Sequence, residues 1–156
     1  MSKFDKALEI ICRLIVIVMW ALAIYFYLNL PIIIPIHFNL KGEVDNYGNK
    51  YSILFMPLIA TVIFFGITFL NKYPHVFNYM KKITSENAIQ QYSIATKMLR
   101  LLKLSILLIF TIITVSMYLI GTGTIRTLSI WILPVILGLI FIPLAISISK
   151  SIKSQS

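Results

Sequence analysis

Residues 14–30 read LIVIVMWALAIYFYLNL, and this stretch decides the fold class. It holds no Asp, Glu, Lys, Arg or His, and roughly 20 apolar residues in a helix suffice to cross a bilayer core about 30 Å thick. Three later stretches repeat the pattern, at residues 53–70, 104–120 and 130–148. The sequence therefore predicts an all-α integral membrane protein, in which residues 1–156 form one domain with four transmembrane helices.

The composition of the whole chain favours the same class. Hydrophobic residues make up 59% of the chain and charged residues 12%, against about 45–50% and about 25% in ordinary globular proteins. A mean hydropathy of +0.92 leaves too little polar surface to cover a soluble domain. The single cysteine, Cys12, cannot form an internal disulfide, and no Cys and His residues have zinc-finger spacing. A soluble enzyme, a zinc finger and a secreted disulfide scaffold are therefore disfavoured.

The basic residues predict the orientation in the membrane. The net charge is +9, but the Lys and Arg residues fall between hydrophobic blocks, which favours topology and anionic lipid over nucleic acid as the explanation. With both termini inside, eleven of the 14 basic residues are cytoplasmic, and only Lys41, Lys50 and Arg126 lie outside. We therefore expect an N-in, C-in, multi-pass membrane protein. Its expected partner is the lipid bilayer, and we expect no nucleic acid partner.

The predicted outer loop, residues 31–52, carries most of the polar side chains outside the cytoplasmic segments. Pro31 and Pro35 favour an extended backbone after the first span. Further on, Asn39, Gly42, Asp45, Asn46 and Gly48 are residues that form turns. We expect an extended segment, then a compact turn shaped by Gly42 and Gly48, and re-entry into the bilayer near Tyr51.

The same loop gathers His37, Asn39, Glu43, Asp45 and Lys50. A metal-binding or enzymatic site built on His37, Glu43 and Asp45 is one interpretation, because carboxylates and imidazole are metal ligands. The other is that these groups satisfy one another and the loop backbone. No second His or Cys completes a usual ligand set, and no Ser or Cys stands near His37. We therefore expect no catalytic residue, no bound metal and no cofactor.

The loop also resembles a known family. The pattern of a bacterial membrane domain of unknown function, present in the SdpI-like immunity proteins against sporulation-delaying toxin, is approximately I-P-x-H-F-N-x-x-G-x-x-D-x-W-G-x-K. This chain departs from it only at Tyr47, and Pro57 matches a later proline; Phe77-Asn78-Tyr79 and the residues from Ile83 to Tyr92 are also similar. The resemblance implies an integral membrane protein of the bacterial cytoplasmic (inner) membrane with a role in toxin immunity. We expect its motif residues to form one structural and functional unit: His37, Phe38, Asn39, Gly42, Asp45, Gly48 and Lys50.

The predicted inner loop, residues 71–103, is expected to be partly helical. Thr84 or Ser85 can cap a helix, with Glu86 in its first turn and an apolar face beyond. On this helix the basic side chains either meet anionic headgroups or only set the topology: Lys97, Arg100 and Lys103. Lys81, Lys82 and the exposed helix face are candidates for contact with a cytoplasmic partner.

Three functions remain open from the sequence. The first is a non-enzymatic immunity or sensing protein whose outer loop contacts a peptide toxin or an envelope component. The second is the membrane enzyme or metal-binding protein described above. The third is an oligomeric transporter or channel, which is disfavoured because ion pathways generally need ionisable residues inside the membrane.

Overall fold

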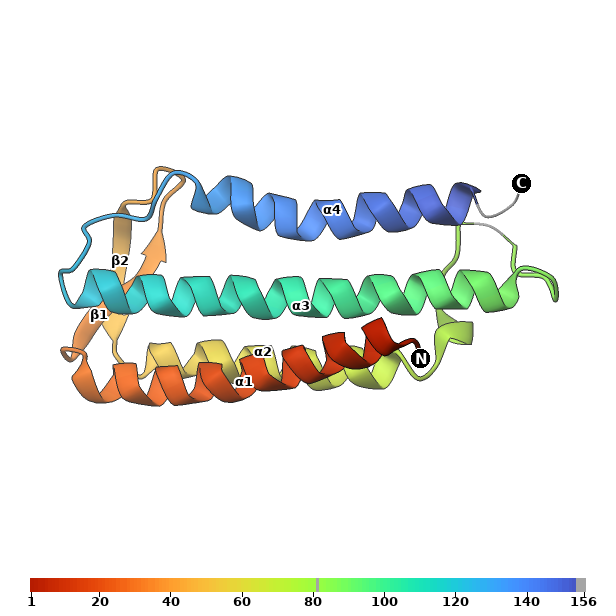
Figure 1. The fold of residues 1–156 in the computed structure, drawn as a ribbon. Coiled ribbons are helices and arrows are strands. Elements are labelled where there is room, and N and C mark those ends of the chain that lie inside the picture. The colour runs from red at the N-terminus through yellow and green to blue at the C-terminus, as the bar shows by residue number, and fades with distance from the viewer. Residues whose placement is uncertain (81, 154–156) are drawn as a thin grey trace.

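Helices dominate the computed structural model, which describes residues 1–80 and 82–153 (Figure 1). Their bounds are Lys3–Asn29 for α1, Ser52–Leu70 for α2, Ala88–Gly121 for α3 and Ile132–Lys153 for α4, and a 3-10 turn, η1, covers Pro74–Val76. All four α-helices are long and apolar enough to cross a membrane. This confirms the predicted fold class. The candidate Lys81 lies outside the described residues.

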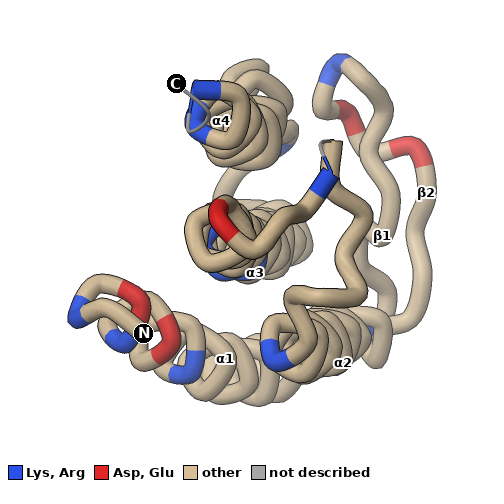
Figure 2. The backbone as a smooth tube through the Cα atoms, turned by 90° about the vertical axis from the view of Figure 1, so that its right-hand side faces the viewer, with Lys and Arg blue, Asp and Glu red and all other residues tan. Residues whose placement is uncertain are grey.

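Three helices form the body of the protein, and the fourth lies at its side. Between α1, α2 and α3 is a core of buried side chains: Cys12, Met19, Ala60, Phe64 and Leu107. Viewed along the helices, α4 packs on α3, on the side away from α1 and α2 (Figure 2). In an 18-residue hydrophobic stretch of α4, only 6% of the residues are buried inside the protein, against 33% in the corresponding stretch of α3. Most of α4 is therefore available to lipid or to another ligand.

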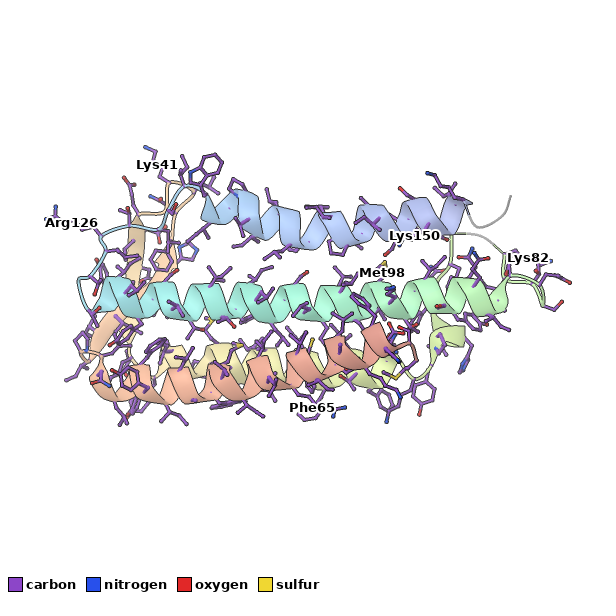
Figure 3. All side chains as sticks on the ribbon, in the orientation of Figure 1. Lys41, Phe65, Lys82, Met98, Arg126 and Lys150 are labelled. Carbon is purple, nitrogen blue, oxygen red and sulfur yellow. The ribbon has the colours of Figure 1, made fainter. Side chains whose placement is uncertain are left out.

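The chain termini and the connections between helices lie at the two ends of the bundle. At one end lie the N-terminus, the last turn of α4, and residues 71–80 and 82–87, with Lys82 and Lys150; we call it the basic end (Figure 3). At the other end, which we call the hairpin end, Lys41 and Arg126 mark the α1–α2 and α3–α4 connections. Each connection thus lies at the end expected from four spans.

Two helices extend well beyond their hydrophobic spans. At the start of α1, Asp5 N donates to Ser2 Oγ at 3.1 Å, and Ser2 N donates to Asp5 Oδ2 at 2.9 Å. This reciprocal capping box starts the helix at Lys3 rather than near Leu14. Hydropathy marks where a helix can enter lipid, whereas capping decides where the helix begins.

The predicted cap of α3 is wrong. The helix begins at Ala88 with Asn87 as its N-cap residue, so Glu86 precedes the first turn. Asn87 Oδ1 accepts from Thr84 N at 2.9 Å, and Asn87 Nδ2 donates to Lys82 O at 3.2 Å. These bonds fold residues 82–87 into a turn ahead of the helix, and from there α3 runs unbroken to Gly121.

Candidate functional site

The predicted outer loop is an antiparallel β-hairpin. Its strands are β1, Ile33–Phe38, and β2, Val44–Asn49. The expected extended exit from the first span corresponds to β1. Ile34 is fully buried there, in the cluster that closes this end of the bundle: Phe26, Leu30, Ile34, Ile53 and Met117. Because a strand residue belongs to the core, the hairpin has a fixed position on the helices.

A single tight turn, residues 39–43, joins the strands. Asn39 Oδ1 accepts from the backbone N–H groups of Lys41 at 2.9 Å and Glu43 at 3.0 Å, and Asn39 Nδ2 donates to Glu43 Oε2 at 2.8 Å. Gly42 has a φ of +80°, which favours glycine. Leu128 N donates to Gly42 O at 2.8 Å, which fastens the turn to the α3–α4 connection.

Only one of the two predicted turn glycines shapes a turn. Gly48 lies in β2 opposite Ile34, and Asp45 and Asn46 also belong to this strand. A Cβ on Gly48 would approach Ile36 Cδ1 to 2.7 Å, so a larger residue at this position would require the Ile36 side chain to shift. Asn39 and Gly42 complete the turn earlier in the chain, which leaves the later residues to pair with β1.

His37 and Asp45 meet on the surface of the hairpin. His37 Nδ1 lies 2.6 Å from Asp45 Oδ1, and the strand register is irregular on both sides of His37. Such irregular pairing re-aims side chains. The His37 side chain keeps 66% of its surface exposed and that of Asp45 41%. Exposed ion pairs contribute little stability, typically about 0–1 kcal/mol. The pair therefore orients the imidazole and leaves it accessible.

The remaining motif residues, Phe38 and Lys50, are engaged inside the protein. Phe38 packs against the buried cluster at the hairpin end. Lys50 Nζ donates to Leu30 O at 3.3 Å and lies 4.7 Å from the centre of the Tyr27 ring. Its charge thus sits at the C-terminal end of α1, where unpaired carbonyls and the helix dipole favour a cation.

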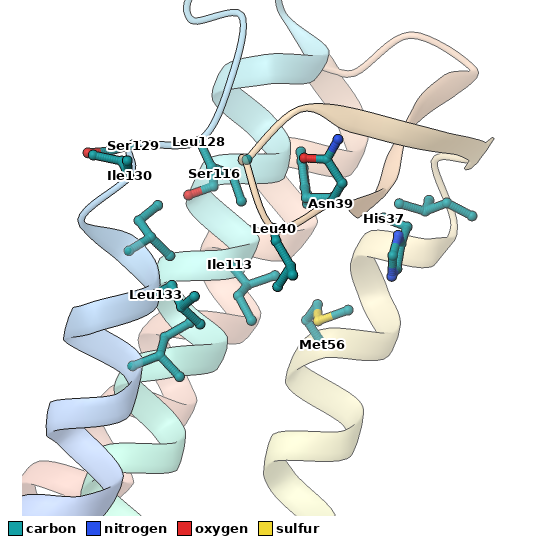
Figure 4. A pocket seen from close by; sticks show the side chains of 15 residues that line it. His37, Asn39, Leu40, Met56, Ile113, Ser116, Leu128, Ser129, Ile130 and Leu133 are labelled. Carbon is teal, nitrogen blue, oxygen red and sulfur yellow. The ribbon is translucent and has the colours of Figure 1, made fainter.

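Below the turn is a cavity of about 390 Å³ (Figure 4). It lies between β1, the turn, α2, α3, α4 and the α3–α4 connection, and its lining is mostly apolar: Met56, Ile113, Leu133 and Ile136 among others. His37, Asn39, Ser116 and Ser129 contribute polar groups. Leu40 hangs from the turn beside the cavity with 90% of its surface exposed. An apolar chamber with a few polar groups suits an amphipathic ligand.

The residues proposed for metal binding do not come together as a set of ligands. Across residues 1–80 and 82–153, no group of three or more His, Cys, Asp or Glu side chains could hold a metal ion. Glu43 bonds to Asn39, whereas His37 and Asp45 bond to each other. The three proposed ligands are therefore divided between two separate interactions.

A second polar site, at the basic end, was not predicted. Lys103 is fully buried; its Nζ donates to Glu9 Oε2 at 2.6 Å and to Thr68 Oγ1 at 2.9 Å. Arg100 Nε lies 3.3 Å from Glu9 Oε1, and Arg100 Nη1 lies 3.8 Å from Asp5 Oδ1. The group joins α1, α2 and α3, and we call these residues the ion network: Asp5, Glu9, Thr68, Arg100 and Lys103.

The ion network argues against the headgroup interpretation of Arg100 and Lys103 and leaves the topology interpretation in place. Both face carboxylates inside the bundle rather than lipid headgroups, and Lys97 Nζ lies 4.6 Å from the Phe4 ring centre. The α3 segment from Lys103 to Gly121 is about 27 Å long at about 1.5 Å per residue, close to the bilayer core of about 30 Å. The sequence contained one signal for this network. Acidic residues precede the first span, at positions 5 and 9, and basic residues precede the third, at positions 100 and 103.

Comparisons with known proteins agree with the membrane class and name no activity. Residues 14–61 match the family model described as "Domain of unknown function (DUF1648)", which covers α1 from residue 14 onward, the hairpin and about half of α2. An uncharacterized protein from Archaeoglobus fulgidus is 26% identical over 86 residues, which is 50% of this chain and 47% of that protein. The chain thus spans about half the length of this relative. No solved structure matches the chain significantly.

Proposed function

We propose that this chain is a non-enzymatic binding protein of the bacterial cytoplasmic membrane, which recognises an external peptide or envelope component at its hairpin end. The cavity of about 390 Å³ beneath the turn is the observation that carries the proposal. Ligand sites are typically about 300–1,000 Å³, mostly apolar, with a few polar groups that fix orientation. Here an apolar segment of the ligand enters the cavity, and the accessible His37 imidazole contacts a polar group beside it.

The motif supports the proposal of a role in toxin immunity or sensing. The residues that resemble the SdpI-like immunity proteins, 34–50, are the ones that build the hairpin and the roof of the cavity. In the N-in, C-in orientation this end faces outward, where a membrane-active peptide toxin would arrive. The basic end and the start of α3 would then face the cytoplasm and any partner there.

Survival of a sensitive bacterium tests the proposal. Cells expressing the wild-type chain would be challenged with membrane-active peptide toxins, beside His37→Ala, Asp45→Ala and Leu133→Trp variants at equal membrane abundance. Leu133 lines the cavity with 46% of its surface exposed, so a tryptophan there fills the chamber without invading the core. We expect protection by the wild type and its loss in all three variants.

The matched control is Leu58→Ala, an exposed position on α2 that does not line the cavity. It should protect as well as the wild type. Protection that is insensitive to every cavity and hairpin variant would contradict a site at this end. A cysteine introduced at Lys41 tests the orientation separately. We expect a membrane-impermeant reagent to label this cysteine in intact cells. A cysteine that is not labelled would place the hairpin end in the cytoplasm.

A further inference from the structure

A second cavity, of about 430 Å³, opens at the basic end. Its walls come from the end of α2, the segment after η1, the first half of α3 and the last turns of α4. Apolar side chains provide most of the lining: Leu70, Val76, Met98, Leu99 and Ile148. Gln91 and Ser151 pair at its edge, where Ser151 Oγ donates to Gln91 Oε1 at 2.7 Å. The cavity is therefore apolar inside and polar toward the chain ends.

A basic depression adjoins this cavity. The start of α3, the turn before it and the end of α4 line this depression, through Glu86, Ile89, Gln90, Ser93, Ile94, Lys150 and Lys153. Ile94 lines both spaces, and Lys150 is the neighbour of Ser151 in the cavity wall. The apolar cavity thus has a cationic depression next to it, which we call the rim, and this arrangement suits an amphiphile with an anionic head.

The charge of the rim is not neutralised by the part of the chain that the structure describes. Lys150 and Lys153 are exposed and form no ion pair there, unlike Arg100 and Lys103, which the ion network neutralises. Glu86 also lines the depression, and hydrogen bonds from Thr84, from its own backbone and from Ser85 keep its pKa below the ordinary value. Among the described residues that line the depression, two cations therefore face one anion, and the excess charge is positive.

We propose that one anionic phospholipid of the surrounding bilayer occupies this two-part site, with an acyl chain in the cavity and its phosphate at Lys150 and Lys153. Lys150 lies at an appropriate depth for a lipid phosphate, because the α4 segment from Ile132 to Lys150 is about 27 Å long, close to the bilayer core of about 30 Å. A second copy of this chain is a poor occupant, because it carries five acidic residues against 14 basic ones, and Asp5 and Glu9 are already paired.

Lipid retention by the purified, full-length protein tests this assignment. The protein in detergent would be incubated with phosphatidylglycerol or with phosphatidylcholine of the same acyl chains, and bound lipid would be counted by native mass spectrometry. We expect one phosphatidylglycerol molecule, held in preference to phosphatidylcholine. Because each basic residue near an anionic surface contributes about fivefold, Lys150→Gln with Lys153→Gln should weaken binding about 25-fold. Glu86→Gln should strengthen it.

Two further variants separate this site from general attraction to a positive protein. Lys3→Gln with Lys6→Gln removes the same charge from exposed positions on α1 at the same end, and should leave binding unchanged. Met98→Trp fills the cavity and should lower retention of the lipid while the lysines remain. Equal binding of the two lipids, or an equal loss in the α1 double variant, would overturn the proposal.

Discussion

The two ends of the bundle differ in where their pairs of polar side chains lie. At the hairpin end, His37 and Asp45 pair on the surface, with most of the imidazole in contact with solvent. At the basic end, Lys103 and Glu9 pair inside the protein, with the Lys103 side chain fully buried. A buried charge that loses its partner is costly, whereas an exposed one is rehydrated. The difference indicates that the ion network holds three helices together, while the hairpin pair is free to meet a ligand.

Breaking the ion network should have the largest effect on stability. Lys103→Met leaves Glu9 buried without its closest partner, and we expect a loss of about 3–5 kcal/mol in the free energy of unfolding. Unfolding in detergent, followed by circular dichroism, measures it.

The matched control is Lys6→Met, at an exposed position of α1, which should change stability by less than about 0.5 kcal/mol. The double variant Glu9→Leu with Lys103→Met removes both charges and should recover part of the loss. A single Lys103→Met variant as stable as the wild type would show that the network does not hold the helices.

A medium effect is expected where the hairpin turn meets the α3–α4 connection. Gly42→Ala adds a Cβ at a φ of +80° that would lie 2.7 Å from Leu128 O, and we expect a loss of about 1–3 kcal/mol. Gly123→Ala is a close control, because Gly123 has a φ of +75° with open space around it. The difference between the unfolding midpoints of the Gly42→Ala and Gly123→Ala variants measures the effect of the contact with Leu128 alone. Equal losses would mean that the turn is not docked on Leu128.

The smallest effect on stability is predicted for the exposed pair. Asp45→Asn keeps the shape of the side chain and removes its charge, so the free energy of unfolding should change by about 0–1 kcal/mol. The same variant should reduce toxin protection if the pair orients His37 for a ligand. A large drop in thermal stability would instead assign the pair to the support of the hairpin, and the contrast between the two ends would disappear.

The spans were predictable because each is long, apolar and free of charge. The helix ends were not, since capping by Ser2 and Asp5 and by the turn at Asn87 involves polar residues outside the hydrophobic pattern. The two strands were also not predictable from the sequence. Pro35 lies within β1, and β2 consists of Val44, Asp45, Asn46, Tyr47, Gly48 and Asn49, of which Asp, Asn and Gly are poor strand formers. Burial of Ile34 against the helices fixes the position of the hairpin, and local strand propensity cannot predict that contact.

The site was predictable in part. Proximity of His37 and Asp45 in the loop suggested their contact, and the role of Gly42 followed from turn chemistry. The cavity depends on α3 and α4, whose arrangement no local pattern specifies. The ion network pairs residues far apart in the chain, so only the spacing of acids before one span and bases before another hinted at it.

The distance in sequence between Glu9 and Lys103 has a consequence for biosynthesis. The two residues are 94 positions apart. Translation at about 5–20 residues per second therefore delivers the lysine about 5–20 seconds after the glutamate. During that interval the first helix enters the membrane with an acid that still lacks its counter-ion. The start of α1 should accordingly stay hydrated at the bilayer surface, and draw fully into the bundle only once α3 has left the ribosome.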